Sequence, residues 1–212
     1  MKADPGTLID ISPPIDARLA VWPGDTSPRR EVLLDIAKGD TVTLSTLHAS
    51  VHLGSHADAP NHYDHAGRSI DRRDLIDYLG ICQVMTVPGK ARSRIQRSDL
   101  TKPILAPRLL LHTGTFPDPA DFRTDFAAIA PELIGFLAAQ GVRLIGIDTP
   151  SVDTFESKDL PTHKSCNSHD MAILEGLVLD SVEEGLYELI ALPLKLVGYD
   201  ASPVRAILRV LP

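Results

Sequence analysis

Residues 52–62 of this chain read His52-Leu53-Gly54-Ser55-His56-Ala57-Asp58-Ala59-Pro60-Asn61-His62. The polar side chains that could bind a metal all stand at even positions: His52, His56, Asp58 and His62. Because alternate side chains of an extended chain point the same way, these groups would face one side of a strand. A helix is disfavoured, since Gly54 and Pro60 oppose it and Asp58 would leave the face that His52 and His56 share. The stretch therefore predicts extended backbone with its polar groups on one face.

A straight strand would keep these side chains too far apart for one metal ion. At roughly 3.3 Å per residue, His52 and His56 would lie about 13 Å apart. Zinc ligands, in contrast, lie about 2.0–2.1 Å from the ion. The chain must therefore bend, and Gly54 can supply a bulge or a turn. Histidine and carboxylate ligands together suit zinc, with manganese as an alternative. We predict a metal site here, which these four residues alone could close as a mononuclear centre.

A second group of candidates lies in the C-terminal part of the chain. Glu175 stands in the otherwise apolar stretch of residues 171–180 (MAILEGLVLD), and His163 precedes it by twelve residues. A buried carboxylate must be paired or metal-bound to offset its desolvation. A second metal ion held by His163 and bridged by carboxylates would explain both residues. The alternative is that Glu175 is solvated at the end of a helix or strand. Cys166, close to His163, is either a soft ligand or buried packing.

Short apolar runs rich in β-branched residues recur along the chain and predict strands. They cover residues 7–11, 31–36, 41–47, 81–87, 108–113, 142–148, 186–197 and 205–211. A helix is predicted over residues 131–139, which begin with Pro131 and end before Gly141. Weaker helical patterns cover residues 73–79 and 170–174. Since no repeat or linker interrupts the chain, we expect one α/β domain over residues 1–212, dominated by β structure.

The composition limits the kinds of partner. Apolar residues make up 43% of the chain and charged residues 23%, a balance that is ordinary for a globular protein. The net charge of −7 disfavours nucleic acid, because phosphate binding relies on clustered Lys and Arg. No apolar stretch approaches the roughly 20 residues that span a bilayer, and the first residues, MKADPGTLIDIS, lack the apolar region of a secretory signal. The two cysteines form no CxxC pair. We therefore expect a cytoplasmic protein acting on a small molecule, without nucleic-acid or membrane partners.

The motif of residues 52–62 resembles the hallmark of the metal-dependent cyclase-like hydrolases, His-x-Gly-Thr-His-x-Asp-x-Pro-x-His, with Ser55 in place of the commoner Thr. Within that family, the chain resembles the bacterial kynurenine formamidases (arylformamidases) over nearly its full length. The segments that carry this resemblance are DISPPI, AVWPGDT, GIDTPSVDTFESK, MAILEGLVLD, GLYELIALPLKL and DASPVRAILR. Among them, GIDTPS and DASPVRA favour the formamidases. The resemblance implies a single-domain, β-rich swivelling β/β/α fold, two Zn²⁺ ions per subunit, and a homodimer or larger assembly.

The resemblance also implies a role for each candidate residue. It assigns a first zinc ion to His52, His56 and Asp58, a second to His163, and bridging positions to Asp58 and Glu175. His62 would be the catalytic acid/base. Trp22 would line the substrate pocket, whereas by sequence alone it could equally be a core residue. Pro161 and Thr162, just before His163, differ from the small residue expected there. His48 shares the parity of the motif and is expected beside it, without an assigned role, and His169 has none either.

The implied reaction is hydrolysis of N-formyl-L-kynurenine to L-kynurenine and formate, a step of tryptophan degradation (the kynurenine pathway). A second hypothesis keeps the metal ions but changes the substrate to a cyclic amide, such as an isatin-like lactam. A third is a non-catalytic binding module on the same scaffold, since function resides in the site and not in the fold. Metal content distinguishes the third hypothesis from the other two. Turnover of formylkynurenine compared with that of cyclic amides distinguishes the first from the second.

Overall fold

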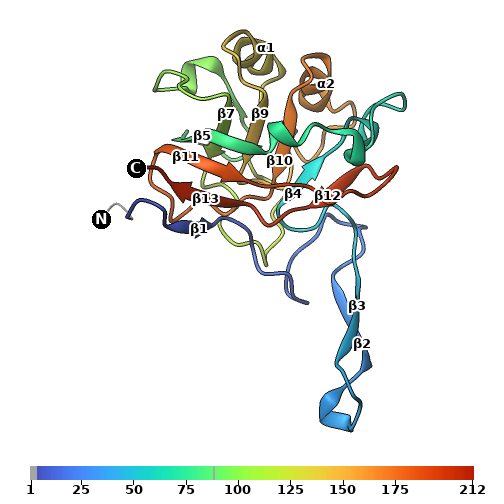
Figure 1. The fold of residues 1–212 in the computed structure, drawn as a ribbon. Coiled ribbons are helices and arrows are strands. Elements are labelled where there is room, and N and C mark those ends of the chain that lie inside the picture. Colours follow the sequence, from blue (N-terminus) through green and yellow to red (C-terminus); the bar gives the residue numbers. More distant parts are fainter. Residues whose placement is uncertain (1–3, 88) are drawn as a thin grey trace.

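A nine-stranded mixed sheet, curled into a half-barrel, forms the body of the molecule (Figure 1). The computed structural model describes residues 4–87 and 89–212, so the first three residues of the N-terminal segment considered above lie outside the described residues. The order of the strands is β1(Leu8–Asp10), β13(Ile207–Val210), β11(Gly185–Ile190), β5(Leu79–Thr86), β7(Arg108–His112), β9(Leu144–Ile147), β10(Ala172–Glu175), β4(His56–Asp58) and β12(Ala201–Pro203). The four strands from β5 to β10 are parallel, and antiparallel strands flank them on both sides.

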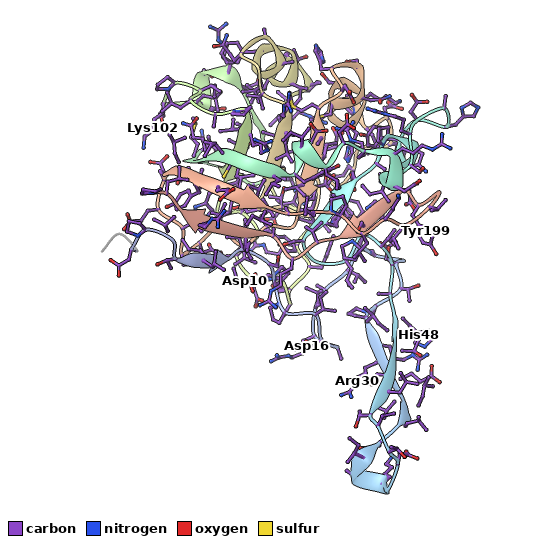
Figure 2. All side chains as sticks on the ribbon, viewed as in Figure 1. Asp10, Asp16, Arg30, His48, Lys102 and Tyr199 are labelled. Carbon is purple, nitrogen blue, oxygen red and sulfur yellow. The ribbon has the colours of Figure 1, made fainter. Side chains whose placement is uncertain are left out.

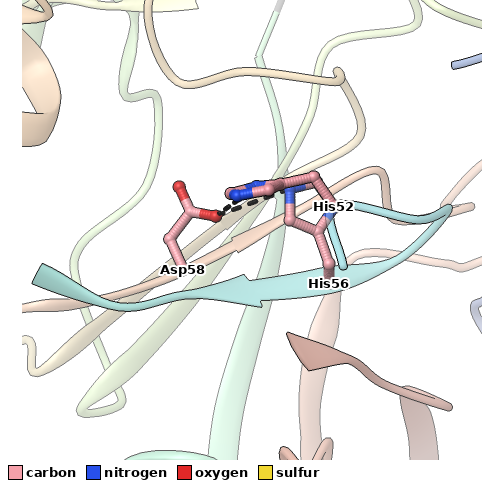
Figure 3. Close-up of side chains that lie close together, drawn as sticks. All are labelled: His52, His56 and Asp58. Carbon is pink, nitrogen blue, oxygen red and sulfur yellow. Dashed lines mark ion pairs between the residues drawn. The ribbon is translucent and has the colours of Figure 1, made fainter. Parts of the chain in front are cut away.

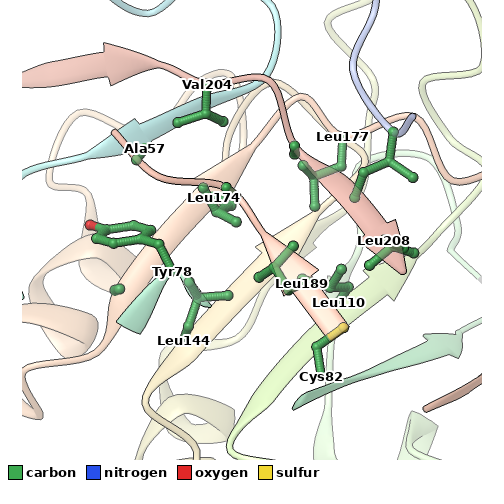
Figure 4. Close-up of a cluster of buried hydrophobic side chains, with 14 of the residues drawn as sticks. Ala57, Tyr78, Cys82, Leu110, Leu144, Leu174, Leu177, Leu189, Val204 and Leu208 are labelled. Atoms are coloured by element: carbon green, nitrogen blue, oxygen red, sulfur yellow. The ribbon is translucent and has the colours of Figure 1, made fainter. Parts of the chain in front are cut away.

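The central strands are buried on both faces, as parallel strands between two layers usually are. Leu109 and Leu111 of β7 pack toward the helices α1(Pro131–Ala139) and α2(Pro161–Ser168), which cover one face of the sheet (Figure 1). Leu110, between them, points into a second apolar cluster on the opposite face (Figure 4). Cys82 of β5 also lies in this second cluster and is buried.

The helix predicted over residues 131–139 is confirmed with the same bounds, and Pro131 is its first residue. The two weaker helix predictions are wrong. Within residues 73–79 only Leu75–Asp77 form a single 3₁₀ turn, and β5 begins at Leu79. Residues 170–174 enter strand β10, whose residues are all buried. A short run that is apolar throughout has no periodicity with which to distinguish a buried strand from a helix.

Helix α2 was not predicted, because its sequence PTHKSCNS has few apolar residues. It buries only Thr162, His163 and Cys166, which lie on one side of this short helix. Four further 3₁₀ turns span Ile36–Lys38, Pro60–His62, Ile70–Arg72 and Arg97–Asp99. The short strands β6(Arg94–Ile95) and β8(Ala128–Ile129) pair with each other outside the main sheet. No helix among the described residues is long and apolar enough to span a bilayer.

The strands β2(Arg29–Leu34) and β3(Leu44–His48) form a separate hairpin that projects away from the body (Figures 1 and 2). We call residues 29–48 the arm. The two strands pair only with each other in the sheets of the described residues, and their register shifts between Val32 and Leu34. No residue of the arm is buried. The strands predicted at 31–36 and 41–47 are therefore present, but they do not contribute to the core.

Two glycines make a close backbone contact beneath the polar cluster. Gly54 and Gly176 both have positive φ angles, of 56° and 66°. A Cβ atom on Gly176 would lie 2.4 Å from the carbonyl oxygen of Gly54. The hydroxyl of Ser55 donates a 2.7 Å hydrogen bond to the Gly176 carbonyl oxygen. The bend predicted at Gly54 is therefore present, and Gly176 allows the chain after β10 to approach it closely.

We predict that Gly176→Ala destabilises the protein. A non-glycine residue in the left-handed region costs about 1–3 kcal/mol, and the contact with the Gly54 carbonyl adds to it. The melting temperature should fall by about 5 °C or more, as measured by circular dichroism. Gly185→Ala is the matched control, since its Cβ would meet only Tyr187 at an ordinary 3.8 Å. Equal melting temperatures for the two variants would contradict the close approach.

Candidate metal centre

Two antiparallel strands place the acidic residues of the site. On β4, His56 and Asp58 alternate with Ala57 and Ala59, which point into the core. His56 is the cross-strand partner of Glu175 on β10. Directly paired residues point to the same face of a sheet, so the pairing of β4 with β10 brings Glu175 beside His56. This is why a carboxylate far along the chain joins the motif at residues 52–62.

The bend at Gly54 brings His52 back toward β4 (Figure 3). The Nδ1 atom of His52 lies 3.2 Å from Oδ1 of Asp58, and Nε2 of His56 lies 3.5 Å from the same oxygen. The prediction of extended backbone holds only for His56–Asp58, because Pro60–His62 form a 3₁₀ turn. The three residues nearest the bend nevertheless converge as predicted.

His163 reaches the cluster from the first turn of α2. Its Nε2 atom lies 3.2 Å from Oδ2 of Asp58 and 3.3 Å from Oε1 of Glu175. The other oxygen of Glu175 lies 3.3 Å from Nε2 of His56. Glu175 is buried and also accepts a 2.7 Å hydrogen bond from the Val152 amide, so the solvated alternative is wrong. The five predicted ligands thus meet in one place.

These residues fit a divalent metal ion. The two carboxylate oxygens of Asp58 are fully buried and have no hydrogen-bond partner, a costly state for an ionised group. Two groups of candidate ligands share Asp58. The first is His52, His56 and Asp58, and the second is Asp58, His163 and Glu175. Within each group the ligand atoms lie within 4.8 Å of one another. Neutral imidazole and carboxylate are a donor set that suits zinc or manganese. The arrangement has room for Asp58 to serve two such ions.

The charges within the cluster favour cations. Burial raises the pKa of the Asp58 carboxyl, but the nearby imidazoles of His163 and His52 outweigh it and hold that pKa well below its usual range. Burial lowers the pKa of His52, but its contacts with Asp58 and Asp200 outweigh that effect and raise the pKa to about 9. The pKa of His163 is likewise raised, since its hydrogen bond with Asp153 and its contacts with Asp58 and Glu175 outweigh burial. Each carboxylate therefore attracts positive charge, which a metal ion can supply.

His62 lies at the edge of the cluster. Its side chain is 33% exposed, and its ring centroid is 4.2 Å from that of His52. Burial lowers its pKa, which favours the neutral imidazole. Its Nδ1 atom lies 3.6 Å from Oδ2 of Asp200, and these two residues with His52 form a third group of possible ligands. The geometry is compatible with His62 as an acid/base and with His62 as a ligand.

Asp153 and Asp200 contact histidines of the cluster, and the sequence did not reveal either contact. Asp153 is buried and contacts Nδ1 of His163 at 2.9 Å, which orients the ring so that Nε2 faces the cluster. Asp200 contacts Nε2 of His52 at 2.9 Å across 148 residues of sequence. Asp153 ends the segment GIDTPSVD, and Asp200 begins the segment DASPVRA. The local sequence does not indicate which histidine each carboxylate approaches.

A cavity of about 440 Å³ opens onto the cluster. Trp22, the predicted substrate-pocket residue, lines this cavity and is half-buried. The indole ring lies 4.9 Å from the ring of Phe155 and 5.6 Å, edge-on, from that of Phe122. Asp148 and Asp180 also line the cavity, and no lysine or arginine is among its lining residues within the described part of the chain.

The remaining candidates lie elsewhere. His48 is in the arm, where its Nε2 atom contacts Glu31 at 2.6 Å, so the expectation that it neighbours the motif is wrong. The parity argument fails there because the chain turns between β3 and β4. Cys166 packs in the apolar cluster under α1 and is in none of the candidate ligand groups. His169 contacts the Ser165 carbonyl oxygen with its Nδ1 atom, at the end of α2.

We predict that Glu175→Ala removes at least one equivalent of metal from the purified protein, because one candidate group loses its second carboxylate. Elemental analysis after dialysis measures this loss. Glu156→Ala, at an exposed site, is the control and should keep its full metal content. Unchanged metal content in Glu175→Ala, with a normal circular dichroism spectrum, would rule out ligation by Glu175.

Comparison with known proteins identifies the family of this chain. Residues 9–154 match the cyclase family model, described as "Putative cyclase". A potential metal-dependent hydrolase with cyclase activity is 30% identical, with a TM-score of 0.81 over 95% of this chain and 96% of that one. A predicted metal-dependent hydrolase from Bacillus stearothermophilus is 30% identical, with a TM-score of 0.80 over 95% and 97%. Isatin hydrolase A from Labrenzia aggregata, 22% identical, shares the fold with a TM-score of 0.81 over 97% and 94%. These likenesses confirm the predicted cyclase-like fold, and the chain belongs to the cyclase family of metal-dependent hydrolases.

Proposed function

We propose that this protein is an arylformamidase that hydrolyses N-formyl-L-kynurenine to L-kynurenine and formate in tryptophan degradation. The observation that carries the proposal is a cavity lined both by aromatic residues, Trp22 and Phe122 among them, and by the histidine and carboxylate cluster. The two segments that favour the formamidases by resemblance, GIDTPS and DASPVRA, supply Asp148, Ser151 and Asp200 to the lining of that cavity. Both of these segments therefore reach the cavity in which a substrate would bind.

In this proposal two zinc ions occupy the two groups that share Asp58. His52 and His56 would hold one ion and His163 the other, with Asp58 and Glu175 as the carboxylate ligands. When bound, such ions lower the pKa of water and polarise a carbonyl oxygen. Asp153 and Asp200 would hold the imidazole rings of His163 and His52 in place through their second nitrogens.

His62 would move the proton. Burial keeps its imidazole neutral near neutral pH, so it can take a proton from the water that adds to the formyl carbon. The C–N bond then breaks, and the arylamine nitrogen leaves with the proton that His62 returns. An arylamine that left as an anion would be a poor leaving group, so this proton is needed. Such acid/base assistance contributes about 10²–10⁴ in rate.

Trp22 would pack against the aryl ring of the substrate. Its contacts with Phe122 and Phe155 limit the orientations of the indole, and aromatic rings gain from edge-to-face and offset contacts. The aryl ring would then lie between the indole of Trp22 and the cluster. In that position its formamide nitrogen could face His62.

The second candidate is a cyclic amide, because the isatin hydrolases share this fold. Two further carboxylates in the cavity lining, those of Asp148 and Asp180, favour the formamidase. The side chain of Asp180 is 53% exposed, whereas Asp148 is buried. The Nε2 atom of His112 lies 3.5 Å from Oδ1 of Asp180 and 3.9 Å from Oδ2 of Asp148. An α-ammonium group complements such an acidic lining, whereas isatin carries no cation. We therefore place the amino-acid part of the substrate beside Asp180.

The central experiment measures formate release from N-formyl-L-kynurenine by the zinc-loaded protein. We expect turnover, and we expect His62→Ala to lower kcat by about 10²–10⁴ while its metal content stays unchanged. His65→Ala is the control, since His65 is exposed and lies outside the cavity lining. If the wild-type protein releases no formate but hydrolyses isatin, the formamidase proposal is wrong and the cyclic amide is the substrate class.

A second prediction concerns the acidic lining of the cavity. Asp180→Asn should raise KM for N-formyl-L-kynurenine about tenfold, because an ammonium group loses its ionic partner. Hydrolysis of formanilide, an aryl formamide without an ammonium group, should not change. Asp74→Asn, at an exposed position outside the cavity, should affect neither substrate. An equal loss for both substrates would show that Asp180 does not recognise the ammonium group.

A further inference from the structure

We propose that His62 and Asp200 form a further, weaker site for a divalent metal ion beside the buried cluster, and that an ion bound there inhibits the enzyme. The Nδ1 atom of His62 and the Nε2 atom of His52 lie 3.6 Å and 2.9 Å from the same oxygen, Oδ2 of Asp200. Candidate ligand atoms of these three residues all lie within 4.8 Å of one another. Two ligands of a tetrahedral zinc ion lie roughly 3.4 Å apart. The separation of His62 and Asp200 therefore fits one zinc ion.

This site is distinct from the buried groups, because His52 turns a different nitrogen toward each. Its Nδ1 atom lies 3.2 Å from Oδ1 of Asp58, whereas its Nε2 atom faces Asp200. A neutral imidazole that binds an ion through Nδ1 keeps its proton on Nε2, where it can donate to Asp200. The further ion would then have two protein ligands, His62 and Asp200, and water. Structural zinc sites have four protein ligands and catalytic ones three, so we expect this site to bind more weakly.

The backbone holds the two ligands of this site next to each other. The amide of Ala59 donates a 2.8 Å hydrogen bond to the carbonyl oxygen of Asp200. The carbonyl oxygen of Ala59 accepts a 2.9 Å hydrogen bond from the amide of His62. Ala59 itself is fully buried. One residue of the core thus fixes the backbone of both ligands, and such preorganisation lowers the cost of binding an ion.

Solvent and charge both favour cations at this site. The side chains of His62 and Asp200 are 33% and 45% exposed, so an ion can reach them without displacing a buried ligand. Both residues line the cavity, and within the described part of the chain its lining has no lysine or arginine. Three more aspartates line it: Asp25, Asp148 and Asp180. A cleft lined by one sign of charge raises the local concentration of counter-ions.

An ion at this site would prevent His62 from carrying a proton. A ring nitrogen that binds a metal ion cannot accept a proton, and the charge of the ion disfavours protonation of the other nitrogen. The inhibition therefore rests on the proposed function, in which His62 is the acid/base, whereas the binding of the ion does not. Zinc would thus support the reaction at the buried groups and inhibit it at this site when its free concentration rises.

The first test counts the zinc bound to the full-length protein by equilibrium dialysis at rising free zinc concentration, with elemental analysis. We expect the ions that the protein retains after exhaustive dialysis, and one further equivalent of lower affinity. His62→Ala and Asp200→Asn should each weaken the binding of that further equivalent at least about tenfold, since loss of an outer-shell partner alone costs about 10–100-fold. Both variants should keep the retained ions, because an asparagine at 200 can still accept a hydrogen bond from His52.

Asp25→Asn is the matched control. Asp25 lines the same cavity but belongs to none of the candidate ligand groups, so this variant should bind the further equivalent as the wild type does. A wild type without a further equivalent would overturn the proposal. So would a further equivalent that both ligand variants bind unchanged, which is an adventitious ion elsewhere, or one that Asp25→Asn loses equally. If one ligand variant does not fold, as judged by circular dichroism, the other decides.

The second test measures formate release from N-formyl-L-kynurenine at the same free zinc concentrations. The wild-type rate should fall over the range in which the further equivalent binds, and a chelator that restores the lower zinc concentration should restore the rate. Magnesium should not inhibit, because it prefers oxygen ligands. Asp200→Asn, compared with its own rate at low zinc, should need at least about tenfold more zinc for half inhibition.

Two results of this second test are kept apart by the metal count. A full rate with the further equivalent bound would contradict the inhibition. If no formate is released at any zinc concentration, the proposed function fails, while the number of bound ions in the wild type and in the two ligand variants still decides whether the site exists.

Discussion

The site depends on the burial of two carboxylates, those of Asp58 and Glu175, within one apolar sheet. Burying an ionised group without compensation is among the most costly changes in a protein. Here three imidazoles approach the two carboxylates within 3.2–3.5 Å, yet the oxygens of Asp58 still lack hydrogen bonds. The charge balance is therefore completed by protons on the histidines or by metal ions. This requirement explains why every nearby polar side chain is turned toward the same point.

The sheet holds this arrangement because it pairs strands from distant parts of the chain. β4 lies between β10 and β12, so the strand of Asp58 is flanked by the strand of Glu175 and by the strand that follows Asp200. The glycines at 54 and 176 let the backbones around these strands approach closely. Helix α2 then adds His163, whose orientation is determined by Asp153. The ligands would therefore be preorganised by the fold, which lowers the cost of binding an ion.

The cavity and the loops at the base of the arm lie next to this centre. The cavity is lined by aromatic residues, among them Trp22, and by the carboxylates of Asp148 and Asp180, so its lining is chemically mixed. The loops on either side of the arm run directly to Trp22 and to His52. Residues that take no part in chemistry can thus influence substrate binding by restraining these loops, as second-sphere and loop contacts commonly do.

The sequence by itself determined the ligand types, the bend at Gly54, helix 131–139 and most of the strands. Each of these depends on local spacing or on the conformational limits of Gly and Pro. It did not distinguish the buried strand at Ala172–Glu175 from a helix, because a uniformly apolar run has no period. Only the tertiary structure placed Asp200 beside His52 and Asp153 beside His163, and only it moved His48 into the arm. Those contacts depend on strand order and chain direction, which pair residues far apart in sequence and leave no trace in local spacing.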